Sequence, residues 1–473
     1  MAAFGASLAG PFHLDDFAIL SDPALTSPGG WWQVWRPLQT RPLTWFTFWL
    51  NYRLGGSGPA GYHLASLALH LGAVLVAYGV LKRLMDRRAA MIAAAIFAIH
   101  PIQAETVNYI FARGTLLMTL LSLASLDAWV RDRHWLAVAW FAAALAAKEE
   151  CVAFPILLLL LNLAPVRSLP IAVMLSLSLA AGLRVVWATS VIAGAGAGAG
   201  ASLAPLDYCA AQGVVILRYF RLLIAPYGFT VDPSVGTFVP AWLAVLAIAF
   251  VALKRQRWFL AGLVLLLPSS SIFPASDLAA DRRMYLPLVA FAVAAGLLLR
   301  PVRARWLAAV AVLLVALSVH RTWVWSSGER LWSEAVERAP RKVRPRIQLA
   351  RAVGGVRAEQ LLAQARALAP EDPNIPAELG RLYLESGRPD RALAEFGKAL
   401  ALAPNHPKAL NNRGTALAAL GQREAAVADF ERALDRDPCL FDARFNLRRL
   451  GLAQSAPDGC RHTPEQARAL VVR

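Results

Sequence analysis

Ionisable side chains gather at the ends of several apolar segments of this sequence. A charge at the centre of a bilayer costs about 2.5–3.5 kcal/mol on insertion scales, so such residues usually pair or serve a function. If they converge, cations can bind a donor phosphate while a carboxylate takes a proton from an acceptor hydroxyl. The planar fork of arginine suits two phosphate oxygens. The clusters are His13 with Asp15 and Asp16; His100 with Glu105 and Arg113; Lys148 with Glu149 and Glu150; and Asp277 with Asp281, Arg282, Arg283 and Tyr285.

Each cluster also has an ordinary structural explanation: an exposed turn, a capped helix break, an interfacial anchor, or a side chain that extends along a span to reach the surface. Asp15 could lie in the exposed turn, and His100 could cap the helix break. Lys148 could be the interfacial anchor, and Arg282 could extend along its span to the surface. His63 could join them, although packing is its favoured role. The case for one site rests on the predicted topology, which places all the clusters on the outer side of a membrane.

The composition is that of a membrane protein with an additional soluble part. Of the 473 residues, 57% are hydrophobic and only 17% are charged, whereas soluble domains carry roughly 25% charged residues. These values exclude a disordered chain, a collagen and a small disulfide scaffold. Loop charges that set membrane orientation explain the formal net charge of +17 better than nucleic-acid binding does. No CxxC pair is present, and Cys439 and Cys460 could form a disulfide in an oxidising compartment.

Apolar stretches between about residues 62 and 320 predict an all-α bundle of membrane-spanning helices. A span needs about 20 apolar residues, and shorter helices are tolerated when they are buried in protein. The positive-inside rule places Lys82 and Arg83 in the cytoplasm and the chemical clusters outside. The segment 207–225 either crosses or, as favoured here, lies in the outer interface. The expected spans are 62–81, 89–99, 114–130, 134–147, 151–163, 169–189, 237–253, 258–268, 284–300 and 306–320.

The predicted topology divides the chain into three parts. Residues 1–61 form a first outer loop with the acidic pair, residues 62–320 form the transmembrane domain, and residues 321–473 form an extracytoplasmic soluble domain. An outer loop at 13–61 requires a preceding outward span, and residues 1–12 are too short to provide one and lack a signal-peptide pattern. A missing first span affects the expected catalytic competence and not the expected fold. The expected location is the cell (inner) membrane.

The C-terminal part contains a sequence repeat with a period of 34 residues. Gly380 aligns with Gly414 and Phe396 aligns with Phe430, which is typical of the paired helices of tetratricopeptide repeats. Small residues allow the two helices to approach closely, and the phenylalanines fill the space between them. The repeats predict a helical solenoid that either binds a peptide or partner on its concave surface or braces the membrane domain.

Several motifs resemble the multi-pass GT-C glycosyltransferases with C-terminal tetratricopeptide repeats, which include the transmembrane and tetratricopeptide repeat-containing O-mannosyltransferases and their bacterial relatives. The most specific is H-P-x3-E-x-V-x2-I-x2-R, which begins at His100. K-E-x5-P at Lys148 and R-x2-Y-L-P at Arg282 support it. The resemblance extends over nearly the whole chain. The segments that carry it are RPLTWFTFWLNYRLGG (41–56), GYHLASLALH (61–70), IFAIHPIQAETVNYIFARGTLLMTLLSLASL (96–126), AAKEECVAFPILLLLL (146–161) and DRRMYLPL (281–288).

The resemblance implies a sugar donor linked to a lipid phosphate, transfer outside the cytoplasm, and a carboxylate base in the first outer loop. That base falls on Asp15 or Asp16. Among the other implied site residues, the arginines and Lys148 are assigned to the donor phosphate and Glu105 to orienting a partner. No metal is predicted, although a carboxylate pair could bind a divalent ion. The other implied site residues are His100, Glu105, Arg113, Lys148, Glu149, Arg282 and Tyr285.

The sequence therefore predicts an integral membrane glycosyltransferase. It would transfer a mannose-like sugar from a polyprenyl phosphate to an extracytoplasmic acceptor, such as a Ser or Thr hydroxyl of a protein, or a glycolipid. The repeats would recognise the acceptor, and no nucleic-acid partner or resident cofactor is expected. Two alternatives stay open: a catalytically inactive scaffold whose repeats recruit an envelope partner, and a ligase or polymerase of diphosphate-linked glycans.

Overall fold

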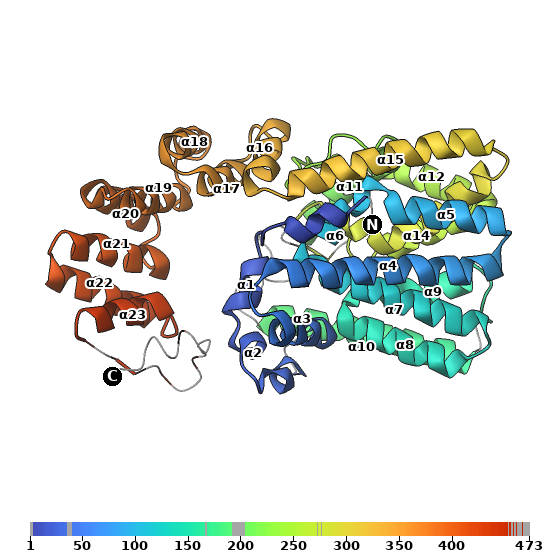
Figure 1. Cartoon of the computed structure of the whole chain (residues 1–473), viewed down its shortest axis with the longest axis horizontal. Helices are drawn as coiled ribbons and strands as arrows, with labels where there is room; N and C mark the ends of the chain where they lie inside the picture. Colours follow the sequence, from blue (N-terminus) through green and yellow to red (C-terminus); the bar gives the residue numbers. More distant parts are fainter. Residues whose placement is uncertain are drawn as a thin grey trace. The chain divides into compact units, whose positions relative to one another are not determined.

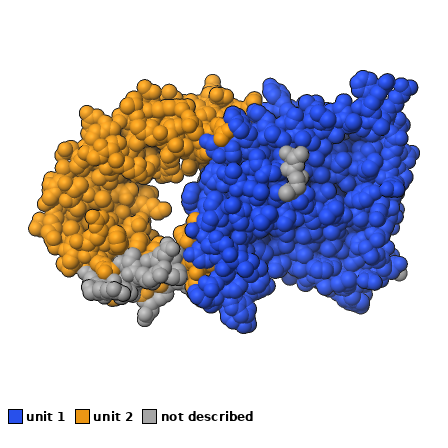
Figure 2. Space-filling model, viewed as in Figure 1, with its two compact units in different colours: residues 1–19, 28–327 blue, residues 20–27, 328–473 orange. Residues whose placement is uncertain are grey.

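The chain forms two compact helical units in the computed structural model (Figure 1, Figure 2). Unit 1 contains residues 1–19 and 28–327, and unit 2 contains residues 20–27 and 328–473. Every regular element in the described part of the chain is an α-helix or a 3-10 helix, which confirms the predicted all-α class. The structure describes residues 3–35, 40–165, 168–191, 204–271, 273–275, 277–452, 454–455, 457, 460 and 466.

Unit 1 is built around two mostly buried helices, α7 (Arg113–Val130) and α14 (Tyr285–Leu299). Helix α7 packs against α4 and α8, and α14 packs against α5 and α13. The other elements assigned to this unit, with α1 continuing into unit 2, are η1 (Gly5–Ala9), α1 (Asp16–Ser21), η2 (Gly30–Trp35), α3 (Pro42–Gly55), α4 (Pro59–Leu84), α5 (Arg87–Ile99), η3 (Pro101–Gln103), α6 (Ala104–Asn108), η4 (Ile110–Ala112), α8 (His134–Ala147), η5 (Glu149–Ala153), α9 (Phe154–Leu160), α10 (Leu169–Val191), α11 (Pro205–Ile224), α12 (Ala241–Arg255), α13 (Arg257–Leu266), η7 (Asp281–Met284) and α15 (Ala304–Trp325).

Five helical segments in the described residues are long and apolar enough to cross a membrane, or six if one bent pair forms a single span. On α10, Leu179 and Leu183 are 65% and 61% exposed. Large exposed apolar faces are unusual in soluble monomers, so these helices are compatible with a membrane protein. The segments are Pro59–Leu84, Ile110–Val130, Leu169–Val191, Asp281–Leu299 and Ala304–Trp325, and the bent pair is Arg87–Ile99 with Pro101–Asn108.

Several predicted spans fold as helices that are shorter than the about 20 residues that a bilayer needs. Helices α8 and α13 are apolar but have only 14 and 10 residues, and α9 has seven. Helices α12 and α13 are separated by Gln256, which has an extended φ of −149° and ends the first helix after its basic last turn. The segment expected at the interface forms α11, which is not among the candidate spans found in the described residues.

The break between α5 and α6 determines where the first cluster of site residues lies. Helix α5 begins at its N-cap Asp86, whose side chain accepts a hydrogen bond from the Ala89 backbone N–H at 3.0 Å. It ends at His100, which adopts an extended conformation before Pro101. The chain then continues at an angle of 45° through η3 and α6. The break thus turns the α6 residues away from the axis of α5.

Unit 2 is a series of paired helices in the described residues. Gly380 and Gly414 face Phe396 and Phe430, because a Cβ atom at these glycines would lie 2.6 and 2.7 Å from the respective rings. The predicted close approach within each pair is therefore present. The elements are α2 (Pro23–Thr26), α16 (Gly328–Arg338), α17 (Val343–Val353), α18 (Gly355–Leu368), α19 (Asn374–Glu385), α20 (Pro389–Leu402), α21 (Pro407–Ala419), α22 (Arg423–Arg436) and α23 (Phe441–Arg449).

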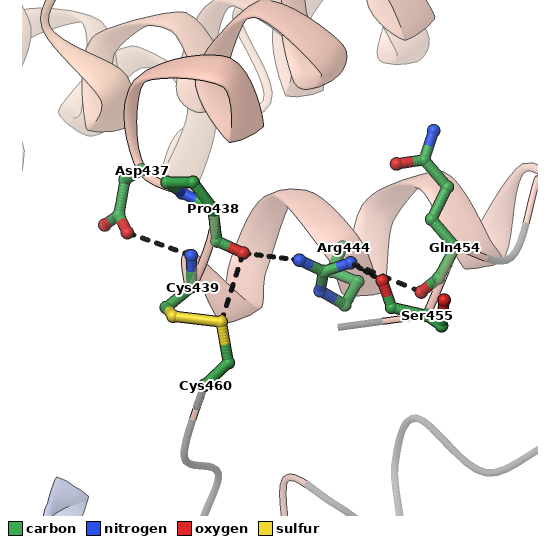
Figure 3. Close-up of a disulfide and its surroundings, with 7 residues drawn as sticks. All are labelled: Asp437, Pro438, Cys439, Arg444, Gln454, Ser455 and Cys460. Carbon is green, nitrogen blue, oxygen red and sulfur yellow. Dashed lines mark hydrogen bonds between the residues drawn. A yellow bond between two sulfur atoms is a disulfide. The ribbon is translucent and has the colours of Figure 1, made fainter. Parts of the chain in front are cut away.

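A disulfide and an arginine hold the C-terminal segment against the last helix of the repeat (Figure 3). Cys439 and Cys460 form the disulfide. Arg444 is 3% exposed and donates hydrogen bonds to the backbone carbonyl groups of Pro438 and Ser455. The expected Cys439–Cys460 pairing is confirmed.

Candidate functional site

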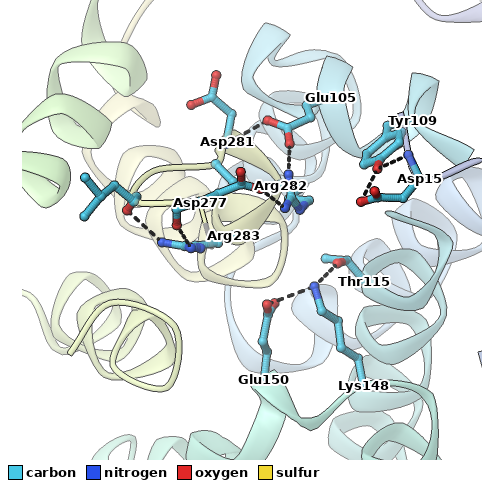
Figure 4. Close-up of polar contacts among 12 residues, drawn as sticks. Asp15, Glu105, Tyr109, Thr115, Lys148, Glu150, Asp277, Asp281, Arg282 and Arg283 are labelled. Carbon is cyan, nitrogen blue, oxygen red and sulfur yellow. Dashed lines mark hydrogen bonds and ion pairs between the residues drawn. The ribbon is translucent and has the colours of Figure 1, made fainter. Parts of the chain in front are cut away.

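Arg282 joins two carboxylates from segments that are distant in the sequence (Figure 4). Its Nη1 donates to Glu105 Oε1 at 2.5 Å, and its Nη2 donates to Asp277 Oδ2 at 2.7 Å. The second Glu105 oxygen accepts the Asp281 backbone N–H at 2.8 Å. Glu105 lies on α6, after the helix break, and Arg282 lies on η7 at the start of α14. The fold therefore brings the second and fourth predicted clusters together.

A second ion pair lies beside the first. Arg218 of α11 donates to Asp281 Oδ1 at 2.6 Å, and both side chains are largely buried. The Asp281 side chain points away from Arg282, while its backbone N–H binds Glu105 (Figure 4). Arg283 donates to the carbonyl oxygen atoms of Leu278 and Asp277. These contacts fix the 277–283 segment around the Arg282 guanidinium.

Tyr109 links the acidic pair of the first loop to Arg282. The Tyr109 hydroxyl donates to Asp15 Oδ2 at 2.9 Å, and it accepts the Asp15 backbone N–H at 3.3 Å. The Arg282 guanidinium lies 5.9 Å from the centre of the Tyr109 ring. Trp325 stacks against the same ring with a centroid distance of 6.0 Å. The first, second and fourth clusters thus meet around one tyrosine.

The two adjacent aspartates have different environments. Asp15 is exposed, whereas Asp16 is fully buried. Asp16 accepts the backbone N–H groups of His13 at 2.9 Å and Phe111 at 2.7 Å, one on each carboxylate oxygen. Burial raises the pKa of Asp16 to about 7, although the two N–H groups act in the opposite direction. Asp16 therefore anchors the loop, and Asp15 keeps an oxygen accessible to solvent.

The third cluster contributes further charges near Arg282. Lys148 Nζ lies 2.9 Å from Glu150 Oε1 and donates to Thr115 Oγ1 at 2.8 Å (Figure 4). Burial lowers the pKa of Lys148, and the neighbouring positive charges of Arg41 and Arg282 act in the same direction. Three cationic groups therefore lie close enough to repel one another.

Glu149 pairs with Arg41 at the start of α3. Arg41 Nη2 donates to Glu149 Oε1 at 2.6 Å, and Arg41 Nε donates to Oε2 at 3.0 Å, so the contact is bidentate. Burial acts to raise the pKa of Glu149, but the charge and hydrogen bonds of Arg41 outweigh it and hold the pKa at about 2. Glu149 is therefore ionised at neutral pH and compensates the Arg41 charge.

Arg113 lies in an aromatic environment close to the cluster. It is 1% exposed, and its guanidinium lies 4.5 Å from the centre of the Phe48 ring. Nη2 donates to Asn51 Oδ1 at 2.8 Å and to the Tyr62 carbonyl at 2.9 Å. These contacts occupy Nη2 and place the Arg113 guanidinium against α3 and the start of α4. Its predicted role at a donor phosphate stays a prediction.

His100 and Tyr285 make contacts within the helix packing. His100 Nδ1 accepts the Ile102 N–H at 3.2 Å, and Nε2 lies 3.2 Å from the Leu223 carbonyl oxygen. The Tyr285 hydroxyl lies 2.7 Å from His70 Nδ1. Both residues are buried, so these contacts account for their polar atoms within the fold. Substrate contacts at either residue stay predictions.

Sequence reasoning assigned no role to Tyr109 and Arg41. Both lie inside segments that carry the family resemblance, but neither type is diagnostic by itself. A tyrosine next to an apolar run usually packs, and a single arginine before a helix is usually solvated. Only the contacts with Asp15 and Glu149 reveal their positions. Arg218 belongs to the segment expected at the membrane interface, and the structure shows that it pairs with Asp281.

A small pocket opens beside the Glu105 cluster. Its volume is about 10 Å³, far below the roughly 300–1,000 Å³ of most ligand sites. It therefore admits only a small group. Its lining includes Glu105, Asp281, Arg321, Phe229, Thr230 and Trp325. In the described part of the chain, no group of three or more His, Cys, Asp or Glu side chains is arranged to hold a metal ion.

Comparisons with known proteins agree with both halves of this description. The tetratricopeptide repeat family model matches residues 377–440. A protein O-mannosyl-transferase of Caenorhabditis elegans is 42% identical over 98 residues, which cover 20% of this chain and 14% of that protein. The curated homologues of the present chain are protein O-mannosyl-transferases. The predicted resemblance to the repeat-containing O-mannosyltransferases is therefore confirmed.

Other matches define how far the similarity extends. The protein O-mannosyl-transferase TMTC3 of Mus musculus is 37% identical over 93 residues, or 20% of this chain and 10% of that protein. The alignments thus span about a tenth to a seventh of the length of these relatives. The crystal structure of yeast Tom70 aligns with 80% of this chain and 88% of that chain at 13% identity, and its TM-score of 0.25 is too low to establish a shared fold.

Proposed function

We propose that this protein is an integral membrane glycosyltransferase of the GT-C type. It transfers a mannose-like sugar from a polyprenyl phosphate to a hydroxyl of an extracytoplasmic acceptor, such as a protein Ser or Thr. The homologous O-mannosyl-transferases support the reaction class. The observation that carries the proposal is the hydrogen bond from Tyr109 to Asp15 beside Arg282, because it joins an accessible carboxylate to a cationic site.

The cationic part of the site suits the donor phosphate. Arg41, Lys148 and Arg282 lie close enough to repel one another, so a phosphate that enters among them gains from all three charges. Each cation already has a carboxylate partner, and these partners limit the cost of burying the charges in the unliganded protein. Glu105 orients Arg282 in this arrangement. Among the predicted phosphate ligands, Lys148 and Arg282 are the two that belong to this group of neighbouring cations.

Asp15 then acts as the general base in a direct displacement. Its carboxylate accepts the proton of the acceptor hydroxyl as that oxygen forms a bond to the anomeric carbon of the sugar. The bond from this carbon to the phosphate oxygen breaks, and its electron pair stays on the phosphate. Arg282 and Lys148 stabilise the charge that develops there. Asp16 holds the loop that carries Asp15 rather than exchanging protons with substrate.

The membrane topology is part of the same proposal. Residues 1–61 form the outer loop, residues 62–320 the transmembrane domain, and residues 321–473 the extracytoplasmic repeat domain of a multi-pass cell-membrane protein. The Cys439–Cys460 disulfide supports the last assignment, because disulfides persist mainly in oxidising compartments. The repeats are positioned outside the cytoplasm to recognise an acceptor protein or glycolipid.

Asp15→Asn provides the decisive test. In membrane vesicles supplied with synthetic polyprenyl-phosphate mannose and an extracted acceptor fraction, we expect sugar transfer to fall by about 10²–10⁴-fold, the usual contribution of a general base. Asp207→Asn is the matched control, since Asp207 is exposed at the first turn of α11. Transfer by Asp15→Asn at the wild-type rate would remove the mechanism. Transfer only from diphosphate-linked oligosaccharides would favour a glycan ligase or polymerase, and no transfer by the wild type would favour a scaffold.

A further inference from the structure

Trp325 is a buried tryptophan at the end of α15 to which the proposed mechanism gives no role. It is 2% exposed, and within the described part of the chain its indole Nε1 has no hydrogen-bond partner. Helix α15 ends at Trp325, unit 1 ends at Ser327, and α16 of unit 2 begins at Gly328. The residue therefore lies where the chain passes from the membrane-like unit to the repeats.

The Trp325 ring supports the residue that orients the proposed base. It stacks on the Tyr109 ring with a centroid distance of 6.0 Å and an angle of 28° between the two planes. The Tyr109 hydroxyl in turn makes two hydrogen bonds to Asp15 (Figure 4). Stacked aromatic rings prefer a defined offset, so one ring limits the tilt of the other. The tilt of Tyr109, and with it the position of the Asp15 carboxylate, thus depends on Trp325.

Trp325 holds the loop that carries Asp15 at a second point, through His13. His13 Nε2 donates a hydrogen bond to the Trp325 backbone carbonyl oxygen at 2.6 Å. The His13 ring also packs edge to face against the indole, with a centroid distance of 5.7 Å. The His13 backbone N–H donates to Asp16 Oδ2 at 2.9 Å. Trp325 therefore contacts the loop itself as well as the tyrosine that binds Asp15.

We infer that Trp325 is a positioning residue for Asp15. This inference rests on the proposed function, because the orientation of Asp15 affects transfer only if Asp15 is the base. Trp325 acts through Tyr109 and His13, so its loss slows the chemical step and leaves donor binding unchanged. The two contacts also fix the position of the base relative to the end of α15, the helix after which the repeats begin.

Steady-state kinetics of the full chain in vesicles compare two substitutions of Trp325. Trp325→Phe keeps a ring that stacks on Tyr109 and removes only the unpartnered N–H, so kcat should stay within about twofold of the wild-type value. Trp325→Leu removes the stacking, and we expect kcat to fall about tenfold at an unchanged KM for the donor. Trp323→Leu is the matched control, since Trp323 lies on the same helix and is 52% exposed.

A double-mutant cycle separates positioning from a general loss of stability. In a Tyr109→Phe background, Trp325→Leu should change kcat little further, because the hydroxyl through which the ring acts is already absent. Residues that act through one another give losses that do not add, whereas independent effects do add. All rates are expressed per monodisperse, folded protein, so partial unfolding of a variant does not imitate the effect.

Hydrogen–deuterium exchange of the full chain in nanodiscs tests the positioning without requiring catalysis. The Asp15 N–H donates to the Tyr109 hydroxyl, so a loop that has lost its support should exchange faster. We expect several-fold faster exchange of the 13–18 segment in Trp325→Leu, and wild-type exchange in Trp325→Phe and Trp323→Leu. His13→Phe cannot donate to the Trp325 carbonyl oxygen and should also speed exchange, so it tests the same support if Trp325→Leu misfolds.

Three results would each overturn the inference. They are unchanged exchange in both Trp325→Leu and His13→Phe, an equal loss of kcat in Trp323→Leu, and fully additive losses for Trp325→Leu and Tyr109→Phe. A higher donor KM at constant kcat would also overturn it, because Trp325 would then act in binding. Faster exchange in a protein that transfers no sugar supports the anchoring of the loop by Trp325 and contradicts the proposed transferase function alone.

Discussion

Tyr109 and Asp15 are joined by two hydrogen bonds, one to the side chain and one to the backbone of the aspartate. The hydroxyl donates to Asp15 Oδ2 and accepts the Asp15 N–H, so it fixes both the position and the orientation of the carboxylate. The same ring stacks with Trp325, and the Arg282 guanidinium also lies over it. The orientation of the proposed base is therefore coupled to the position of the proposed phosphate ligand.

Removal of the Tyr109 hydroxyl should slow transfer without weakening donor binding. In Tyr109→Phe the ring still packs against Trp325, but the charged Asp15 carboxylate loses the hydrogen bond that the Tyr109 hydroxyl donates to it. Such bonds contribute about 1.5–3 kcal/mol, so we expect kcat to fall roughly 10- to 100-fold. The KM for the donor should stay unchanged, and steady-state kinetics in vesicles measure both. A rise in KM at constant kcat would show that Tyr109 acts in binding and not in positioning the base.

Asp16 should make the stability of the protein depend on pH. Its pKa is about 7 in the folded chain and about 3.9 in an unfolded chain. Between these values the folded state binds the additional proton, so the stability contributed by Asp16 falls as pH rises from about 4 to 7. The thermal midpoint of the wild type minus that of Asp16→Asn should decrease between pH 5 and pH 8. A difference that increases with pH would contradict a raised pKa.

The glycines of the repeat should be intolerant of a methyl group. A Cβ atom at Gly414 would lie 2.7 Å from the Phe430 ring and 3.1 Å from the Ala426 carbonyl oxygen. Overpacking of this kind costs about 1–3 kcal/mol, so Gly414→Ala should lower the midpoint of thermal unfolding of the full chain. Gly397→Ala serves as the control, because a Cβ atom there would have open space around it. Equal midpoints for the two variants would contradict the close packing of α21 and α22.

The disulfide should report the compartment of the repeat domain. Protein alkylated during lysis, before any reduction, should carry no label at Cys439 and Cys460, and reduction should expose both. Cys209 is free and partly exposed, and it provides the positive control for labelling. The Cys439→Ser, Cys460→Ser double variant should lose about 2–4 kcal/mol of stability in the absence of reductant. Full labelling of Cys439 without reduction would place the domain in a reducing compartment.

Local sequence patterns identified most elements of the fold. The 34-residue repeat, with Gly380 and Phe396 in equivalent positions to Gly414 and Phe430, predicted the helix pairs, because small and large residues must face each other at that spacing. Helix lengths in the membrane-like unit were less predictable. Apolar composition alone does not reveal that the expected span 151–163 divides into η5 and α9, since the end of a helix depends on how its neighbours pack.

The sequence alone determined which residue types were available for chemistry, where the helices lie, and that the C-terminal part repeats, because these follow from composition and periodicity. Only the tertiary structure decided that Asp15 is exposed while Asp16 is buried, and that Tyr109 and Arg41 belong with the charged clusters. Adjacent aspartates are equivalent in a linear sequence. They differ in the folded chain because burial and hydrogen bonding depend on residues about a hundred positions away.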